Sequence, residues 1–243
     1  MPAKSLRIAD LKHQIGRFRR NARRGPSQRW GRDFVQEYAT RIKPEPKIIF
    51  DVGGFIGLNA LRYSDAFPTA KVYTFEPTSE NLRAMDDVLA GKPDIIRKQL
   101  AVGAETGTLK IAYDQEHPSM SRAADSTSKS VEEVPLTTID QFADDENIGL
   151  IDILKIDTEG HELEVLKGAQ GVLAASRVGV LILECGFRPN DDIHLNYADL
   201  SAVLFGHDYR LFGFYDQWED TLNPGPDIRR ADVAFVAPHI WNA

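Results

Sequence analysis

Four acidic residues stand where short apolar runs of the sequence end. Asp51 and Glu76 close two such runs in the first third of the chain, and Asp157 and Glu184 close two more further along. In an α/β protein the carboxyl ends of parallel strands meet at one edge of the sheet, where ligands bind. Four carboxylates at one edge repel one another unless something positive lies among them. The sequence therefore predicts a site there for a cationic ligand, a metal ion or the hydroxyl donors of a sugar.

A glycine-rich turn follows the first apolar run. The expected cofactor-binding residues are Asp51, Gly53, Gly54, Phe55, Gly57, Glu76 and Pro77. Glycines let the backbone approach a ligand, and an acid after the next strand binds ribose hydroxyls. The turn lacks the Gly-x-Gly-x-x-Gly spacing, and the chain has no phosphate-binding Gly-x-x-x-x-Gly-Lys loop. An acid before the glycines suits the amino group of a methionine portion better than a pyrophosphate, which favours S-adenosyl-L-methionine over NAD.

A second group of ionisable residues, Asp157, Glu159 and His161, gathers where an apolar strand runs into a helix. Close carboxylates share a proton, act as a base or hold a metal, and a histidine can act as a general base. Glu159 also suits the positive end of a helix, and His161 suits a cap, so structural roles stay open for both. For Glu184, too, both a role as a site carboxylate and a purely structural role stay open. The histidines lack metal-ligand spacing, so no metal site is expected, although a divalent ion between Asp157 and Glu184 stays open.

The elements that must position these residues alternate between strand and helix patterns. We expect strands at 47–52, 71–75, 95–102, 107–112, 131–135, 151–156, 179–185, 208–214 and 231–237. We expect helices at 57–66, 79–90, 138–144, 161–174 and 196–206. This alternation predicts a Rossmann-like, doubly wound and mostly parallel α/β sheet, with the last two strands forming an antiparallel pair at one edge. Residues 103–130 are expected to form a hairpin and a mobile loop over the site.

Charge divides the 243-residue chain unevenly. Its net charge is −7, yet residues 1–32 carry ten Lys and Arg and one acid, a net +9, which leaves −16 for the rest. We expect residues 1–46 to form a basic helical extension, with a helix over 6–24 and another over 31–42, and residues 47–243 to form the α/β domain. An acidic body argues against nucleic acid as a partner. The basic arm either packs on the domain or on a partner subunit, as in a homo-oligomer, or contacts an anionic surface.

The cysteine content and the hydropathy of the chain indicate its cellular compartment. Cys185 is the single cysteine, which excludes an internal disulfide. The longest apolar run is too short to span a bilayer, and no signal-peptide pattern follows Met1. We therefore expect a cytoplasmic location.

Five segments together resemble the FkbM-type methyltransferases. They are Phe50–Gly57, Phe75–Pro77, Val134–Asp140, Leu154–Ala169 and Leu183–Glu184. Their order and spacing match the family over about residues 47–186, and the Lys-Ile-Asp-x-Glu-Gly-x-Glu signature is specific. The resemblance implies an S-adenosylmethionine-dependent O-methyltransferase acting on sugars, glycolipids or natural products, a small-molecule or glycan acceptor. Asp51 and the glycines would lie under the methionine portion and Glu76 on the ribose.

The resemblance also implies that Asp157, Glu159 and Glu184 line the transfer site. The family usually has Asn where this chain has Phe55, which removes a polar contact near the cofactor. For the base we expect Asp157 or His161. Two rivals stay open: an NAD-linked nucleotide-sugar oxidoreductase or epimerase, which usually needs a Tyr-x-x-x-Lys pair that the chain lacks, and a non-catalytic binding module.

Overall fold

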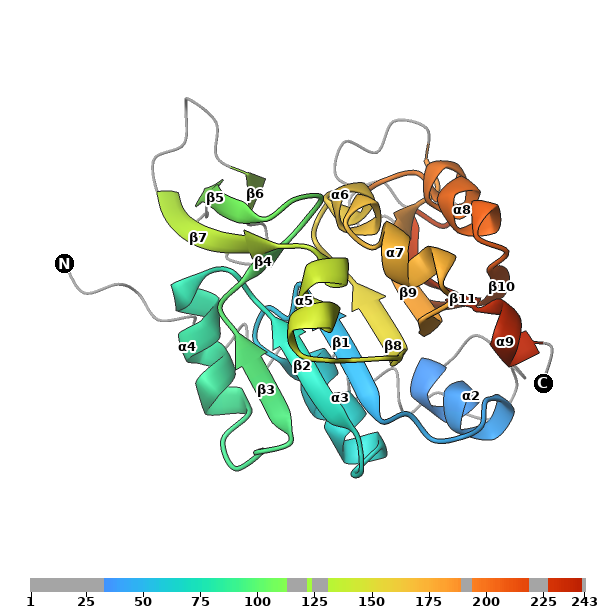
Figure 1. Ribbon diagram of the computed structural model, residues 1–243, viewed down its shortest axis with the longest axis horizontal. Helices are drawn as coiled ribbons and strands as arrows, with labels where there is room; N and C mark the ends of the chain where they lie inside the picture. The colour runs from blue at the N-terminus through green and yellow to red at the C-terminus, as the bar shows by residue number, and fades with distance from the viewer. Residues whose placement is uncertain (1–32, 113–121, 124–130, 189–193, 219–226, 242–243) are drawn as a thin grey trace.

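A seven-stranded sheet forms the centre of the protein in the computed structural model, which describes residues 33–112, 122–123, 131–188, 194–218 and 227–241 (Figure 1). Its strands, in spatial order, are β10 (Arg210–Trp218), β11 (Arg230–Val236), β9 (Val178–Gly186), β8 (Ile151–Ile156), β1 (Ile48–Val52), β2 (Lys71–Phe75) and β3 (Ile95–Lys98). The five strands from β9 to β3 are parallel, and β11 runs antiparallel to both of its neighbours. The expected Rossmann-like α/β class is confirmed.

The antiparallel pair lies at one edge, as the sequence predicted, but the reversed strand β11 is the inner member. It is inserted between β9 and β10, so that the outermost strand β10 runs in the same direction as the parallel strands. This order brings the start of β11 beside the carboxyl end of β9, with Asp232 opposite Glu184. An acidic residue that lies far from the other acids in sequence therefore joins them in space.

Helices cover both faces of the sheet because alternate strand residues are apolar on each side. One face packs on α2 (Phe34–Arg41), α3 (Leu58–Ala66) and α4 (Ser79–Val88) through a core that includes Ile49, Val72, Ile153 and Val180. The other face packs on α5 (Ile139–Asp145), α6 (Glu162–Lys167), α7 (Gln170–Ala174) and α8 (Tyr197–Gly206). A short helix α9 (Pro238–Trp241), which the sequence did not predict, ends the described chain.

The helix predicted over 161–174 is wrong as a single element. It divides into α6 and α7 at Gly168, where an added Cβ atom would lie 2.0 Å from the carbonyl oxygen of Gly103. The carboxylate of Asp140 then accepts hydrogen bonds from the backbone N–H groups of Gly171 and Val172, at 2.7 and 2.8 Å, and caps α7. Close backbone approach and a distant cap, neither visible as a local pattern, decide this break.

The strand predicted over 95–102 also divides. β3 stays in the main sheet, whereas β4 (Ala101–Val102) pairs with β7 (Val131–Thr137) in a second sheet of order β4-β7-β5-β6. β5 (Gly107–Ala112) pairs antiparallel with β6 (Arg122–Ala123), within the range of the expected hairpin, and also with β7, which lies beyond that range. The loop expected over the site lies mostly outside the described residues. Glu132 of β7 ties this small sheet to the main domain by accepting from the N–H group of Ser79, at 3.0 Å.

Residues 34–42 of the expected N-terminal extension pack as part of the α/β domain. Phe34 and Tyr38 are buried in the core beneath the sheet, and Glu37 accepts a hydrogen bond of 2.9 Å from the hydroxyl of Tyr215. The predicted helix over 6–24 lies outside the described residues. Every described helix is too short or too polar to cross a lipid bilayer.

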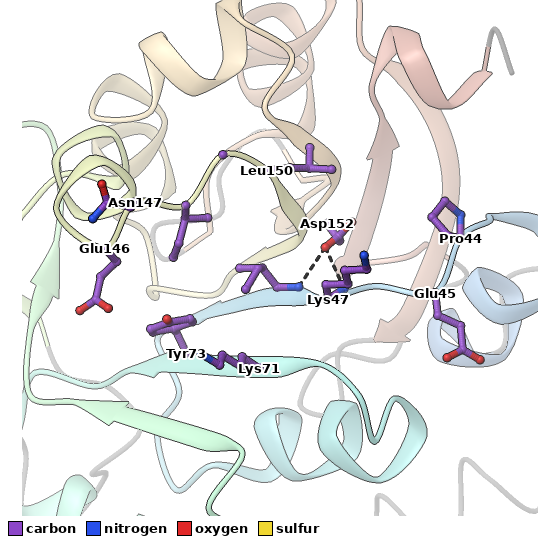
Figure 2. A pocket seen from close by; sticks show the side chains of 12 residues that line it. Pro44, Glu45, Lys47, Lys71, Tyr73, Glu146, Asn147, Leu150 and Asp152 are labelled. Atoms are coloured by element: carbon purple, nitrogen blue, oxygen red, sulfur yellow. Dashed lines mark hydrogen bonds between the residues drawn. The ribbon is translucent and has the colours of Figure 1, made fainter.

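A cavity of about 410 Å³ opens at the amino ends of β1, β2 and β8 (Figure 2). Asp152 lines it and accepts hydrogen bonds from the N–H groups of Lys47 and Ile48, which fixes the entry of β1 into the sheet. This cavity lies at the opposite end of the strands from the acidic residues that the sequence singled out.

Candidate functional site

The glycine turn after β1 lies against the ends of two neighbouring strands. The N–H groups of Gly53 and Gly54 both donate to the carbonyl oxygen of Phe75, at 3.0 and 2.9 Å. Gly53 has φ +84°, and a Cβ atom on it would lie 1.8 Å from the carbonyl oxygen of Asp157. Any side chain at Gly53 would therefore collide with the exit of β8. Phe55 has φ +48°, a left-handed conformation that asparagine tolerates better than phenylalanine.

Glu76 connects this turn to the exit of β2. Its Oε2 accepts from the N–H group of Phe55 at 3.0 Å. Its Oε1 accepts from the backbone and hydroxyl of Thr78, at 3.0 and 2.7 Å, and from the amide of Asn81 at 3.1 Å. Burial outweighs these hydrogen bonds and raises the pKa of Glu76. Since a carboxylate offers about four lone-pair sites, Oε2 keeps the capacity to accept one more donor. Pro77 follows and is half-buried.

Asp51 is fully buried beside the same turn. Its Oδ2 accepts a hydrogen bond of 3.1 Å from the hydroxyl of Thr74, while its Oδ1 is buried without a hydrogen-bond partner. Burial raises the pKa of Asp51 to about 6, and the positive charge of Lys155 opposes that rise. A buried carboxylate oxygen without a hydrogen-bond donor is energetically costly.

Lys155 is the positive group among the acids, and sequence analysis missed it. Its side chain is 3% exposed, and its Nζ lies 3.1 Å from Asp157 Oδ2 and 2.9 Å from Asp232 Oδ1. Burial by itself lowers the pKa of a lysine, but the attraction of Asp157 and Asp232 outweighs it and holds the pKa of Lys155 well above its usual value. Strand alternation was the available signal, because Lys155 and Asp157 must share a face of β8.

Glu184 meets a second internal cation. Its Oε1 lies 2.6 Å from the guanidinium of Arg230, which also donates to His194 Nε2 at 3.0 Å. Because a guanidinium only donates, this ring nitrogen acts as the acceptor. Burial, followed by the charge of Asp157, raises the pKa of Glu184 well above its usual value. Burial, again followed by Asp157, raises the pKa of Glu159 to about 7.

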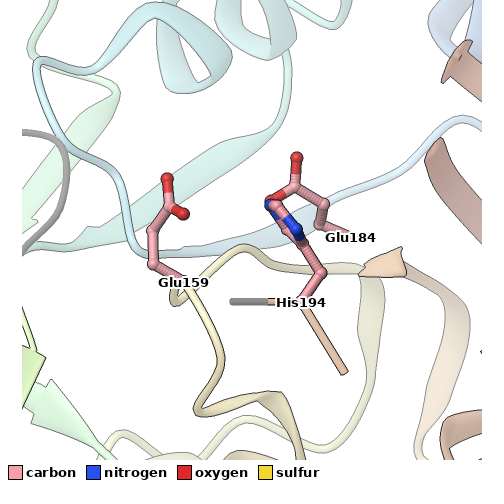
Figure 3. Close-up of side chains that lie close together, drawn as sticks. All are labelled: Glu159, Glu184 and His194. Atoms are coloured by element: carbon pink, nitrogen blue, oxygen red, sulfur yellow. The ribbon is translucent and has the colours of Figure 1, made fainter. Parts of the chain in front are cut away.

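Glu159, Glu184 and His194 lie close together at the carboxyl edge of the sheet (Figure 3). Asp157, Glu184 and Asp232 form an overlapping group. His161 is the N-cap residue of α6, where its carbonyl oxygen accepts from the N–H groups of Glu164 and Val165, and it belongs to neither group. Glu162, which shares its signature, accepts from the N–H groups of Thr158 and Gly160 and closes that loop.

The expectation that only a ligand could relieve repulsion among the acids needs correction. Lys155 and Arg230, both supplied by the chain, neutralise part of the charge of Asp157 and Glu184, and N–H donors satisfy Glu76. Among the described acids, three buried carboxylate oxygens still accept no hydrogen bond: Oδ1 of Asp51, Oε2 of Glu162 and Oε2 of Glu184.

Comparison with known proteins identifies the class. The model of the methyltransferase FkbM domain matches residues 51–211, and the chain belongs to this family. Methyltransferase sdnD of Sordaria araneosa is 30% identical over 162 residues, which cover 51% of this chain and 61% of that protein. Hexuronic acid methyltransferase AglP of Haloferax volcanii is 29% identical over 165 residues, covering 66% of each. The matches thus span about three fifths to two thirds of these relatives' lengths.

A solved structure supports the fold. The crystal structure of methyltransferase FkbM from Methylobacillus flagellatus KT superposes with a TM-score of 0.53 at 18% identity, covering 93% of this chain and 60% of that one. At this identity the likeness concerns the architecture.

Proposed function

We propose that this protein transfers the methyl group of S-adenosyl-L-methionine to a hydroxyl oxygen of a sugar, glycolipid or natural-product acceptor. The observation that carries the proposal is the buried Oδ1 of Asp51, which lacks a donor beside the glycine turn. The positively charged amino group of a methionine portion would satisfy it. Membership of the FkbM methyltransferase family supports the reaction class, and one relative is named for a hexuronic acid. That relative supports a sugar acceptor for this chain.

The residues around the turn suit such a cofactor. Glu76 Oε2 retains capacity for one ribose hydroxyl, and the absence of side chains on Gly53 and Gly54 lets the turn pack closely on Asp157 and Thr74 beside it. When bound, the cofactor supplies an electrophilic methyl group. The FkbM match leaves the NAD-linked oxidoreductase without support, and a binding module would share the pocket but not the transfer.

In the proposed reaction Asp157 is the base. Lys155 Nζ lies 3.1 Å from Asp157 Oδ2. The side chain of Asp157 is 28% exposed, so Asp157 Oδ1 is left for an acceptor hydroxyl. As the hydroxyl oxygen forms its bond to the methyl carbon, the carbon–sulfur bond breaks and the hydroxyl proton passes to Asp157. Much of the acceleration comes from holding the two reactants in line. Glu159 and Glu184 would orient the acceptor beside this oxygen.

Cofactor binding gives the first test. S-adenosylhomocysteine should raise the melting temperature, whereas NAD should not. Asp51→Asn should weaken the calorimetric affinity for S-adenosylhomocysteine about 10- to 100-fold, the value of a hydrogen bond to a charged group. Unchanged affinity in this variant would remove the basis of the proposal. Stabilisation by NAD alone would restore the oxidoreductase, and methyl transfer to no acceptor of a broad panel despite tight binding would favour the binding module.

The same test has a pH dependence. Only ionised Asp51 attracts an ammonium group, and burial raises the pKa of Asp51 to about 6. Wild-type affinity should therefore fall as the pH drops through 6, while the Asp51→Asn variant loses this component of the slope. The folded protein without ligand shows the opposite sign, because a raised carboxyl pKa relieves the cost of the buried charge as the pH falls.

The base is tested by a pair of variants. Asp157→Asn should lower the rate of methyl transfer to a glycan acceptor at least about 100-fold, as expected for loss of a general base. His161→Asn serves as the comparison and should change the rate less than about threefold. The measurement is transfer of a labelled methyl group under saturating cofactor. If His161→Asn suffers the larger loss, the base is His161 and the assignment to Asp157 is wrong.

Other expectations stay predictions. The basic segment 1–32 lies outside the described residues, so its contact with an anionic surface stays a proposal. We also keep as predictions a homo-oligomeric state, a cytoplasmic location and the absence of nucleic acid among the partners.

A further inference from the structure

We infer that Glu159, Glu184 and His194 bind a divalent cation of the Mg²⁺ or Mn²⁺ type at the carboxyl edge of the sheet. One oxygen of each carboxylate and one ring nitrogen lie within 4.8 Å of one another (Figure 3). The three side chains come from different places: the loop after β8, strand β9, and the segment before α8. Two carboxylates and one imidazole form a donor set suited to hard and borderline divalent ions.

The spacing of the donor atoms fits such an ion. Ligands about 2.1 Å from an octahedral metal lie about 3.0 Å apart when adjacent and about 4.2 Å apart when opposite. His194 Nε2 and Glu184 Oε2 are separated by 3.4 Å, between these two values. Side-chain adjustments of less than about 1 Å, without movement of the strands, would complete the coordination.

An independent observation points to a ligand. The side chain of Glu184 is only 9% exposed, and its Oε2 is buried and accepts no hydrogen bond. The same atom faces the ring of His194 at 3.4 Å, so the orphan oxygen is aimed into the group. A buried carboxylate oxygen without a donor is energetically costly, and a bound cation would remove that cost.

Arg230 holds the position of a cation in the described structure. Its guanidinium contacts Glu184 Oε1 and the lone pair of His194 Nε2, but it leaves Glu184 Oε2 unsatisfied. The Arg230 side chain is 27% exposed and belongs to the first residue of β11. Arg230 and the metal therefore compete for the same imidazole nitrogen.

The overlapping group of Asp157, Glu184 and Asp232 is the weaker choice. The Nζ of Lys155 already lies 3.1 and 2.9 Å from two of its members and is almost fully buried. A metal there would have to share a closed space with a positive charge. The cation beside Glu184 and His194, the guanidinium of Arg230, is instead 27% exposed.

The role of the ion rests on the proposed function. With three protein ligands, a six-coordinate ion keeps about three positions for other oxygens. Two of them suit adjacent hydroxyl groups of a sugar, and the ion would lower the pKa of the hydroxyl that attacks the methyl carbon. The acceptor class is then a vicinal diol, as in most glycans.

Binding of Mn²⁺ tests the site without knowledge of the acceptor. Titration of the full chain, followed by loss of the electron paramagnetic resonance signal of free Mn²⁺, should show one ion per chain that Mg²⁺ displaces. Glu184→Gln and His194→Gln should each weaken binding at least about tenfold. Arg230→Gln should tighten it several-fold, because the competing guanidinium is gone. Glu164→Gln, the same charge change on an exposed face of α6, should leave it unchanged.

Two results would overturn the inference. One is no bound Mn²⁺ up to about 1 mM in both the wild type and Arg230→Gln, the weak limit of protein sites for hard cations. The other is equal Mn²⁺ affinity in the wild type and in His194→Gln. Affinity for S-adenosylhomocysteine, measured on the same samples, separates the metal site from the proposed function. If the protein binds the cofactor but not Mn²⁺, only the metal site is wrong. If it binds Mn²⁺ but not the cofactor, only the transferase proposal is wrong.

Discussion

Replacing Gly53 with alanine is expected to destabilise the protein by about 2–5 kcal/mol and to abolish binding of S-adenosylhomocysteine. The residue has φ +84°, which costs an alanine about 1–2 kcal/mol. An added Cβ would also lie 1.8 Å from the carbonyl oxygen of Asp157, and relieving that overlap by shifting packed backbone costs about 1–3 kcal/mol more. Because the collision is with backbone, the turn itself must move, and Asp51 and Glu76 lose their common geometry.

Gly91→Ala is the matched control. Gly91 has φ +79°, nearly the same backbone conformation, but a Cβ there would meet nothing within 4 Å. Gly91→Ala should lower the unfolding free energy by about 1–2 kcal/mol, the cost of the left-handed backbone conformation for alanine, and leave cofactor affinity unchanged. Urea unfolding and calorimetry measure both quantities. Equal losses of stability in the two variants would show that the approach of the turn to β8 is not as close as described.

Lys155→Met should cost about 3–5 kcal/mol of unfolding free energy at neutral pH. The change removes the buried cation that neutralises Asp157 and Asp232 and leaves those carboxylates uncompensated. Methionine fills a similar volume, so a packing defect contributes little. Lys167→Met is the control: that lysine is exposed and pairs with Glu164 on the surface, so its loss should cost less than about 1 kcal/mol.

The pH dependence of the unfolding free energy distinguishes an electrostatic role of Lys155 from a packing role. The pKa of Lys155 in the folded protein lies above its unfolded value, so its stabilising contribution is complete below the unfolded pKa and disappears as the pH rises through the folded one. The variant should instead recover stability between about pH 8 and about pH 5, as the stranded carboxylates take up protons. Asp232→Asn added to Lys155→Met should restore part of the loss. A loss that is independent of pH would mean that Lys155 acts through packing.

Lys155 and Arg230 explain how so many acidic side chains can lie close together at one edge of the sheet. Each cation lies between two partners, Lys155 between Asp157 and Asp232, and Arg230 between Glu184 and His194. The chain thus supplies part of the neutralisation itself, and buried oxygens of Asp51, Glu162 and Glu184 accept no hydrogen bond. The Asp51 oxygen lies beside the glycine turn, and the Glu184 oxygen faces His194.

Several parts of the site followed from local sequence. Asp51, Glu76, Asp157 and Glu184 all lie at or next to the carboxyl ends of parallel strands, where each apolar run of the sequence ends. The glycine turn was predictable because a left-handed conformation and close backbone contact both require that residue. Glu162 proved to close its own loop, as an acid at a helix start often does.

The sequence alone determined the fold class, the family signature and the acids at the strand ends, since strand periodicity and glycine geometry are local properties written in consecutive residues. Only the tertiary structure brought Lys155, Asp232, Arg230 and His194 to those acids, because insertion of β11 between β9 and β10 sets which distant residues face one another. It also decided where the helix over 161–174 breaks, through contact with Gly103 and a cap from Asp140. Pairing of charges across strands depends on register, and register is a property of the assembled sheet.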